Sequence, residues 1–143
     1  MIHESSHAGY LLSDDPARLS LEVIHRYLSE ESYWAAHIPR EIVARSLENS
    51  LGIGIYAPTG EQVGFARVIS DFATYAWLCD VFVHEDYRGK GVGKWLMATI
   101  ISHPDLHDLR RIMLATRDAH GLYSQFGFTS MNNPERWMER FNA

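Results

Sequence analysis

The sequence has a single cysteine, Cys79, among its 143 residues. One thiol cannot form an internal disulfide, so a disulfide-stabilised secreted scaffold is excluded and a reducing compartment is expected. No apolar run approaches the roughly 20 residues that a membrane span needs. The first ten residues, MIHESSHAGY, also lack the charged and apolar regions of a signal peptide. These absences predict a cytoplasmic protein without a membrane partner.

Excess positive charge is absent as well, since 13 Lys and Arg residues stand against 18 Asp and Glu residues and give a net charge of −5. A general nucleic-acid partner is therefore not expected, because neutralised phosphates supply most of the affinity of such proteins. The negative balance is compatible with a cationic acceptor such as an amine.

The eight histidines do not form a known metal-binding motif. His103 and His107 have the i, i+4 spacing of ligands on one helix face, but Pro104 lies between them and argues against a continuous helix. Neither a cysteine cluster nor an HExxH motif accompanies them, so no metal site is expected.

Apolar residues are abundant, at 46%, which predicts one domain with a real core over residues 1–143. Their spacing predicts helices over 18–29, 39–49 and 120–126, and one more that ends at Pro104. Either Ser20 or Asp15 could cap the first of them. Strands are predicted at Tyr10–Leu12, Ile53–Tyr56, Gln62–Ile69, Thr74–Val83, Arg110–Ala115, Phe128–Met131 and Arg136–Phe141. The expected fold class is α/β, with a mixed sheet of about six to seven strands and helices on both faces.

The most informative stretch covers residues 80–101, DVFVHEDYRGKGVGKWLMATII. Three glycines at alternate positions, Gly89, Gly91 and Gly93, separate an apolar strand from a helix. Without Cβ atoms, the backbone there can bring its N–H groups close to a bulky anion. The positive end of the helix dipole favours a phosphate group at the same place. Mobile positive charge around this loop comes from Arg88, Lys90 and Lys94.

Two common phosphate-binding loops do not fit this spacing. A Walker loop requires Gly, four residues and then Gly-Lys-Ser/Thr, but Arg88 stands at its first position and Trp95 at its last. The dinucleotide fingerprint fails because Lys94 stands where its third glycine belongs. The remaining pattern is Arg-x-x-Gly-x-Gly, formed by Arg88, Gly91 and Gly93. Between a strand and a helix, it resembles the acetyl-CoA-binding segment of the GCN5-related N-acetyltransferase (GNAT) family.

A second segment, Ala119-x-x-Leu122-Tyr123-x-x-Phe126-Gly127-Phe128, is also similar to this family. The family pattern typically has an Asn where this chain has Thr116, so the resemblance does not imply the hydrogen bond from that Asn to substrate or pantetheine. The order of the expected elements resembles the family layout over nearly the whole chain. The resemblance therefore implies a GNAT-like acyl-CoA N-acyltransferase fold, and acetyl transfer from acetyl-CoA to an amine by direct attack in a ternary complex.

The resemblance assigns the donor site to the strand before the glycine-rich loop and to the loop itself. In the family, a bulged and splayed strand end supplies a backbone donor for the developing oxyanion and lets pantetheine lie along the strand. The acetyl-CoA-binding residues that it implies are Val81, Phe82, Val83, Arg88, Gly89, Lys90, Gly91, Val92, Gly93 and Lys94.

Two residues are candidates for proton transfer. Tyr123 fits the family's Leu-Tyr position, and a tyrosine with a pKa near 10 can donate a proton to a leaving thiolate; the alternative is that it packs against the sheet. Asp80 is the only charged residue between Thr74 and Val83, where a carboxylate is costly unless it is paired or used. It is either the base that deprotonates the amine or the ion-pair partner of Arg67. In many relatives the amine proton passes to water instead.

Tyr33 and Trp34 lie in the connector between the first two expected helices, which lines the acceptor pocket in the family. They either stack on a cationic or aromatic substrate or pack at the edge of the core. The expected acceptor is the primary amine of a small molecule. Acetylation of a protein amine, or CoA binding without turnover in a sensor module, are the alternatives. The sequence leaves the oligomeric state open, and a homodimer is possible.

Overall fold

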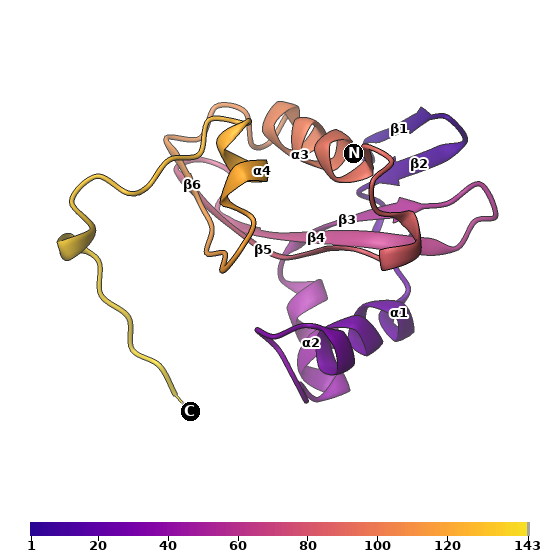
Figure 1. The fold of residues 1–143 in the computed structure, drawn as a ribbon, viewed down its shortest axis with the longest axis horizontal. Helices are drawn as coiled ribbons and strands as arrows, with labels where there is room; N and C mark the ends of the chain where they lie inside the picture. The colour runs from indigo at the N-terminus through magenta and orange to yellow at the C-terminus, as the bar shows by residue number, and fades with distance from the viewer. Residues whose placement is uncertain (143) are drawn as a thin grey trace.

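Six strands form one sheet in which neighbours in the sequence are also neighbours in space (Figure 1). The computed structural model describes residues 1–142. Each strand from the first to the fourth is antiparallel to the next, and the sixth pairs parallel with the fifth. The strands are β1 (Glu4–His7), β2 (Tyr10–Ser13), β3 (Leu51–Tyr56), β4 (Gln62–Ser70), β5 (Tyr75–Val83) and β6 (Arg111–Met113). The predicted mixed α/β sheet is confirmed, and β1 is a strand that the sequence did not indicate.

Helices cover both faces of this sheet, with α1 and α2 on one face and α3 and α4 on the other (Figure 1). The helices are α1 (Leu21–Arg26), which continues into a π-helical turn at Tyr27–Glu31, α2 (Arg40–Glu48), α3 (Val92–Ser102) and α4 (His120–Ser124). Short 3-10 turns lie at Pro16–Arg18, Glu85–Tyr87 and Pro134–Arg136. Over residues 1–142, none of the helices has the length and apolar character needed to cross a membrane.

Both of the caps that the sequence suggested for the first helix are used, each on a different turn. Ser20 Oγ accepts a hydrogen bond from the Val23 N–H at 3.2 Å and caps α1. Asp15 Oδ1 accepts one from the Ala17 N–H at 3.0 Å and caps the 3-10 turn before it. Such a cap satisfies one of the N–H groups that the start of a helix leaves without a partner.

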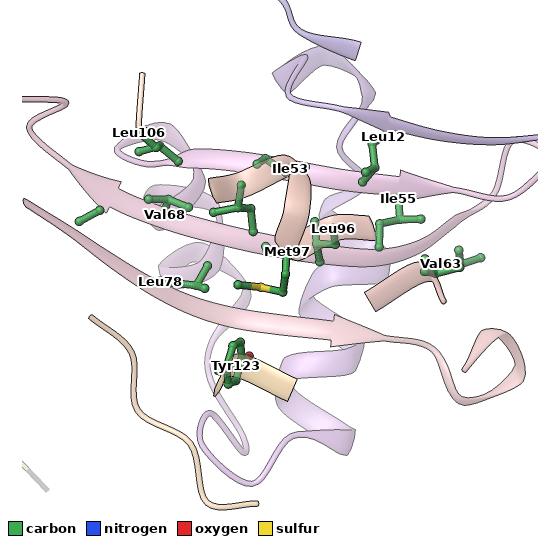
Figure 2. Packing of buried hydrophobic residues seen from close by; sticks show 14 of the residues in the cluster. Leu12, Ile53, Ile55, Val63, Val68, Leu78, Leu96, Met97, Leu106 and Tyr123 are labelled. Carbon is green, nitrogen blue, oxygen red and sulfur yellow. The ribbon is translucent and has the colours of Figure 1, made fainter. Parts of the chain in front are cut away.

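Two apolar layers hold the helices to the sheet. The larger lies between the sheet and α3 with α4, and it includes Leu78, Leu96 and Met97, which are at most 2% exposed (Figure 2). The smaller lies under α1 and α2 and consists of Ile24, Leu28, Val43, Phe65 and Phe82. Burial of one large apolar side chain contributes about 1.5–3 kcal/mol, so these layers fix the two pairs of helices on opposite faces.

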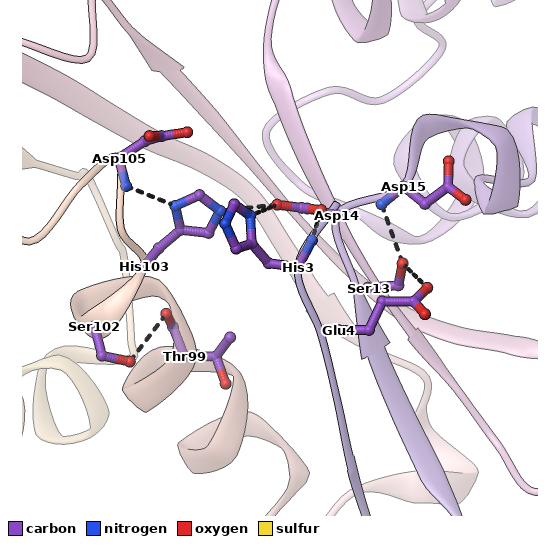
Figure 3. A network of polar contacts seen from close by, with 9 residues as sticks. All are labelled: His3, Glu4, Ser13, Asp14, Asp15, Thr99, Ser102, His103 and Asp105. Atoms are coloured by element: carbon purple, nitrogen blue, oxygen red, sulfur yellow. Dashed lines mark hydrogen bonds and ion pairs between the residues drawn. The ribbon is translucent and has the colours of Figure 1, made fainter. Parts of the chain in front are cut away.

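A buried carboxylate ties the first two strands to the end of α3 (Figure 3). Asp14 Oδ1 accepts a hydrogen bond from the His3 backbone N–H at 2.7 Å. Its Oδ2 lies 2.9 Å from His3 Nδ1 and 2.8 Å from His103 Nε2. Burial raises the pKa of Asp14, but the hydrogen bonds from His3 and His103 outweigh burial and bring that pKa below its ordinary value. The carboxylate therefore stays charged and fastens the three segments together.

The C-terminal part of the chain differs from the expectation. The predicted strands Phe128–Met131 and Arg136–Phe141 are wrong, since neither range forms a strand. β6 is also shorter than predicted, with three residues. The chain of residues 129–142 runs out beyond the sheet instead (yellow in Figure 1), although the Trp137 ring lies 5.0 Å from the Arg111 guanidinium carbon of β6. A strand depends on a neighbouring strand for its backbone hydrogen bonds and packing, so local propensity alone does not create one.

Candidate active site

A β-bulge interrupts β5 at Asp80. Phe65 pairs with Phe82 and Arg67 with Cys79. Asp80 and Val81 of β5 therefore both lie opposite Ala66 of β4. Asp80 has a φ of 53°, in the left-handed region that Asp adopts more readily than most residues. A bulge of this kind bends the strand and changes the direction of a side chain. Here it brings the Asp80 carboxylate to the same side as Arg67.

One edge of β5 is unpaired around this bulge. β6 pairs with β5 only from Tyr75 to Trp77, opposite Arg111 to Met113. β5 continues to Val83 on its β4 side, so within residues 1–142 its other edge has no partner strand from 78 to 83. Such an edge presents N–H and C=O groups to an extended chain. A bulged and splayed strand end, as the resemblance implied, is therefore present.

The glycine-rich loop leaves the N-terminus of α3 open. Gly91 is the N-cap residue with a φ of 77°, and the first helical hydrogen bond runs from the Trp95 N–H to the Gly91 carbonyl. The N–H groups of residues 92–94 precede this bond and have no acceptor among the described residues. A Cβ atom on Gly89, Gly91 or Gly93 would meet no atom within 4 Å. The helix therefore presents donors and its positive dipole end to an open space that suits a phosphate group.

The basic side chains around this loop are held differently. Arg88 Nε donates to the Val83 carbonyl at 2.8 Å, and its Nη2 donates to the Tyr27 hydroxyl at 3.0 Å. Lys90 and Lys94 are exposed. The sequence suggested three mobile cations, but Arg88 is a fixed link between the end of β5, the loop and the turn after α1.

Asp80 is held by two donors. Arg67 Nε donates to its Oδ2 at 2.8 Å, and Trp34 Nε1 donates to its Oδ1 at 2.8 Å. The side chains of Arg67 and Asp80 are 16% and 11% exposed. Since both carboxylate oxygens already accept a bond, protonation of either would weaken one of these contacts. The geometry favours the ion pair with Arg67, which was one of the two alternatives, and the role of Asp80 as a base stays a prediction.

The connector between α1 and α2 joins Asp80 to the segment before α4. Trp34 bonds to Asp80, while the hydroxyl of its neighbour Tyr33 accepts a hydrogen bond from the Arg117 backbone N–H at 3.0 Å. The Arg117 guanidinium carbon lies 3.9 Å from the centroid of the Tyr33 ring, a cation–π contact. One face of Tyr33 therefore already carries a cation. Sequence reasoning missed Arg117, because a contact across 84 positions leaves no local signal.

Tyr123 lies on α4, with 9% of its surface exposed. Its ring packs edge-on against Phe128 at a centroid distance of 5.9 Å. Burial, and to a smaller extent the nearby Tyr33, raises the pKa of Tyr123. Its hydroxyl has no hydrogen-bond partner within residues 1–142 and stays protonated at neutral pH, so it is available as a donor. Thr116, at the position of the family's Asn, accepts a bond from the Ala119 N–H at 3.0 Å.

Three of the predicted site residues, Tyr33, Trp34 and Asp80, come together at the bulge of β5. The Tyr33 ring contacts that of Trp34 at a centroid distance of 5.1 Å. Trp34 in turn bonds to Asp80 at the bulge. The glycine-rich loop begins just beyond the end of the same strand. A single strand thus connects the loop to the residues proposed for chemistry.

One other cluster has the composition of a metal site. Ligand atoms of His3, Asp14 and His103 all lie within 4.8 Å of one another. The Asp105 N–H donates to His103 Nδ1 at 3.1 Å, so the ring carries its proton on Nε2 and donates it to Asp14. A ring that bound a metal through Nε2 would carry its proton on Nδ1, facing that N–H. The hydrogen bonds are therefore those of a carboxylate, Asp14, held between the side chains of His3 and His103.

A mixed sheet with a bulged and half-unpaired strand, followed by a glycine-rich turn into a helix, is the architecture of an N-acyltransferase. The Acetyltransferase (GNAT) domain matches residues 48–130. A relative from Gibberella zeae that is named as an acetyltransferase is 31% identical over 135 residues, which are 81% of this chain and 76% of that protein. A Xanthomonas campestris pv. campestris crystal structure assigned to the GNAT family is 46% identical, with a TM-score of 0.89 over 99% of this chain and 94% of that chain. The chain belongs to the GNAT family of acetyltransferases.

Two more distant proteins add chemical context. The spermine/spermidine N(1)-acetyltransferase of Bacillus subtilis is 35% identical over 89 residues, which cover 53% of this chain and 57% of that protein. The chain therefore matches little more than half the length of that enzyme. A Clostridium acetobutylicum crystal structure with acetyl-CoA is 13% identical, with a TM-score of 0.68 over 99% of this chain and 96% of that chain. At this identity the likeness shows the fold alone.

Proposed function

We propose that the protein is an acetyl-CoA-dependent N-acetyltransferase whose acceptor is the primary amine of a small molecule. The observation that carries the proposal is the unpaired edge of β5 at residues 78–83, which leads into the open N-terminus of α3. Pantetheine needs an extended edge and pyrophosphate needs several donors, and here the two follow each other along the chain. An acetyltransferase relative that is named for spermine and spermidine supports an amine acceptor. The related fold solved with acetyl-CoA supports the donor.

In this proposal the donor lies along residues 81–83 and around residues 88–94. Val92 is 5% exposed and Phe82 stacks on Tyr27 at a centroid distance of 3.9 Å, so these two contribute their backbone and not their side chains. The N–H groups of residues 92–94 donate to phosphate oxygens, and the exposed Lys90 and Lys94 add positive charge.

Acetyl transfer requires that a C–N bond forms while the thioester C–S bond breaks. The amine first loses a proton, and because both oxygens of Asp80 are bonded to Arg67 and Trp34, we assign this step to water. The amine nitrogen then attacks the thioester carbonyl carbon, and a backbone N–H at the bulged strand end stabilises the charge that develops on its oxygen. The Tyr123 hydroxyl donates its proton to the leaving sulfur and regains one from water.

The acceptor is proposed to bind beside Tyr33 and Trp34. Both rings are partly accessible, at 47% and 42%, although Arg117 covers one face of Tyr33. In this arrangement Asp80 acts as a positioning residue, because it holds Trp34 and Arg67 in place. A substrate ammonium group would find the accessible ring of Trp34 and the Asp80 carboxylate on the same side of the sheet.

Thiol release from acetyl-CoA tests the proposal when the full chain is incubated with a panel of primary amines that includes spermidine, amino acids and lysine peptides. We expect release that depends on a small amine, with one acetylated product for each thiol. CoA binding in calorimetry without thiol release from any acceptor would indicate a sensor module. Release with lysine peptides alone would indicate a protein acceptor. The reaction without an added amine gives the hydrolysis background.

A further inference from the structure

Arg67 carries hydrogen-bond donors that the fold does not use. Its guanidinium has five N–H groups in one plane, of which the Nε–H donates to Asp80 Oδ2 at 2.8 Å. The N–H groups on Nη1 and Nη2 have no acceptor among residues 1–142. In this part of the chain the Tyr56 hydroxyl is the only fully buried side-chain nitrogen or oxygen without a partner. Nη1 and Nη2 of Arg67 therefore reach a space that solvent can enter.

The Arg67 guanidinium is also held in one position. Its side chain is 16% exposed, and the Asp80 carboxylate that holds its Nε is itself held by Trp34 Nε1 at 2.8 Å. Arg117, which stacks on Tyr33, is the other guanidinium near the predicted acceptor residues, and its side chain is 65% exposed. An exposed arginine loses side-chain freedom when it binds a ligand, whereas a buried and bonded one loses little. Arg67 is therefore the cation better suited to specific recognition.

Arg67 lies beside the bulge at which acetyl transfer is proposed. On β5 it pairs with Cys79, the residue immediately before Asp80. Asp80 in turn joins it to Trp34, the ring beside which the acceptor is proposed to bind. An acceptor that brings its amine to the bulge therefore brings the atoms near that amine within reach of Nη1 and Nη2.

The free donors and the local charge suit a carboxylate. Two parallel N–H groups of a guanidinium match the two oxygens of a carboxylate. Because Asp80 already offsets the charge of Arg67, a group with one negative charge is favoured over a phosphate group, which carries about two. The Arg67–Asp80 pair and the Arg117–Asp118 pair each have no net charge. An acceptor with one charge of each sign fits these surroundings better than a polyamine with several positive charges.

We propose, on the basis of the proposed function, that Nη1 and Nη2 of Arg67 bind a carboxylate of the acceptor. The acceptor is then a small primary amine that also carries a carboxylate, which is the class of the amino acids. Asp80 holds the Nε side of the guanidinium, and the acceptor takes the other side. Such a site discriminates against an amine of the same shape without the carboxylate, because the Nη donors then lose water and gain no acceptor.

Thiol release from acetyl-CoA tests this proposal with matched pairs of acceptors. Each amino acid is compared with the amine that has the same side chain but no carboxylate, and spermidine represents the polyamines. In the preferred pair, kcat/KM of the wild type should be about 10- to 100-fold higher for the amino acid, as expected for hydrogen bonds to a charged group.

Arg67→Lys keeps a charge that can pair with Asp80 but removes the Nη groups. This variant should have a higher KM for the amino acid and an unchanged kcat, because it loses binding that is equal in the ground state and the transition state. Its kcat/KM for the amine without a carboxylate should stay within about two-fold of the wild-type value. Arg18→Lys is the matched control, since Arg18 Nε also donates to a carboxylate, Glu4 Oε2 at 2.6 Å, but at the β1 side of the sheet. It should keep the wild-type preference.

The proposal would be overturned if the wild type acetylated spermidine or the amines without a carboxylate as well as the amino acids. It would also be overturned if Arg67→Lys lost the same factor for both members of a pair, which is the result expected of a purely structural residue. Either outcome leaves the proposed function intact. The absence of thiol release with every acceptor would instead refute the proposed function. Titration of N-acetyl amino acids in the presence of CoA would then decide the subsite: binding about 10-fold weaker in Arg67→Lys supports it, and equal or undetectable binding in both proteins overturns it.

Discussion

Replacement of Tyr123 by Phe should separate the two roles of this residue, packing and proton donation. The ring, which packs against Phe128 within the larger apolar layer, stays in place. The hydroxyl has no hydrogen-bond partner within residues 1–142, so its removal leaves no donor or acceptor unpaired. We expect the free energy of unfolding to change by no more than about 0.5 kcal/mol.

The expected effect on catalysis is far larger. General-acid assistance is typically worth about 10²- to 10⁴-fold, which corresponds to about 2.7–5.4 kcal/mol of activation free energy. kcat should therefore fall at least about 100-fold, while the affinity for acetyl-CoA hardly changes. Since burial raises the pKa of Tyr123 above its ordinary value of 10.0, the wild type should lose this donor only at a pH above that value.

Steady-state thiol release with a series of thioesters measures this effect. The defect of Tyr123→Phe should shrink when the thiol of the donor is more acidic, because a better leaving group needs less help. Tyr56→Phe is the matched control, since Tyr56 is also buried with a hydroxyl that lacks a partner but lies on β3. Its kcat should not change. The acid role would be refuted if the kcat of Tyr123→Phe were within about two-fold of the wild-type value. It would also be refuted if the loss in kcat were the same for every thioester in the series.

Two further substitutions test the polar contacts that organise the fold and the site. Asp80→Asn tolerates the positive φ of that position but leaves Arg67 without a counter-ion, so denaturant unfolding should show a loss of about 1–3 kcal/mol. The folded fraction should keep its kcat; unchanged stability together with activity lost at low pH would instead support Asp80 as a base. Burial raises the pKa of Asp14, but the hydrogen bonds from His3 and His103 lower this pKa by more, so it lies below its ordinary value. The charged carboxylate therefore stabilises the fold above about pH 4, and this stabilisation is lost as pH falls through the folded-state pKa. Asp14→Asn should be less stable than wild type at neutral pH, with a difference that shrinks in acid, whereas Asp108→Asn, exposed at 89% of its side chain, should show neither effect. A difference for Asp14→Asn that is the same at every pH would contradict this reasoning.

The part of the fold that local patterns determine could be predicted well. β5, the glycine-rich loop and α3 follow from an apolar run, three glycines and a helical repeat that are consecutive in the sequence. The hairpin of β3 and β4 follows from two apolar runs around a turn, and Ser20 was one of two predicted caps. In each case the residues that determine the element lie within a few positions of one another.

The remaining features depend on contacts between distant segments. The left-handed φ of Asp80 is set by the pairing of β4 and β5, and the stacking of Arg117 on Tyr33 joins two loops. Arg88 carries the charge that the motif predicted, but its orientation depends on Tyr27. The predicted strand at residues 136–141 failed for a related reason, because a strand-like pattern does not say which edge, or which copy of the chain, will pair with it.

Titration of CoA into Gly93→Leu shows directly whether the N-terminus of α3 binds the pyrophosphate of the donor. A Cβ atom at Gly93 would point into open space, and side chains on a helix point toward its N-terminus. A leucine there would therefore occupy the proposed phosphate position. It should not weaken the helix, because Gly is about 0.8–1.0 kcal/mol less favourable than Ala inside a helix and Leu is close to Ala.

Ala98→Leu is the control, since it adds the same side chain on the exposed face of α3. Calorimetry should show CoA binding at least about 10-fold weaker in Gly93→Leu, equivalent to about 1.4 kcal/mol, with an undiminished melting temperature. Ala98→Leu should bind CoA like the wild type. Equal affinity of CoA for the two folded variants would contradict the proposed donor site.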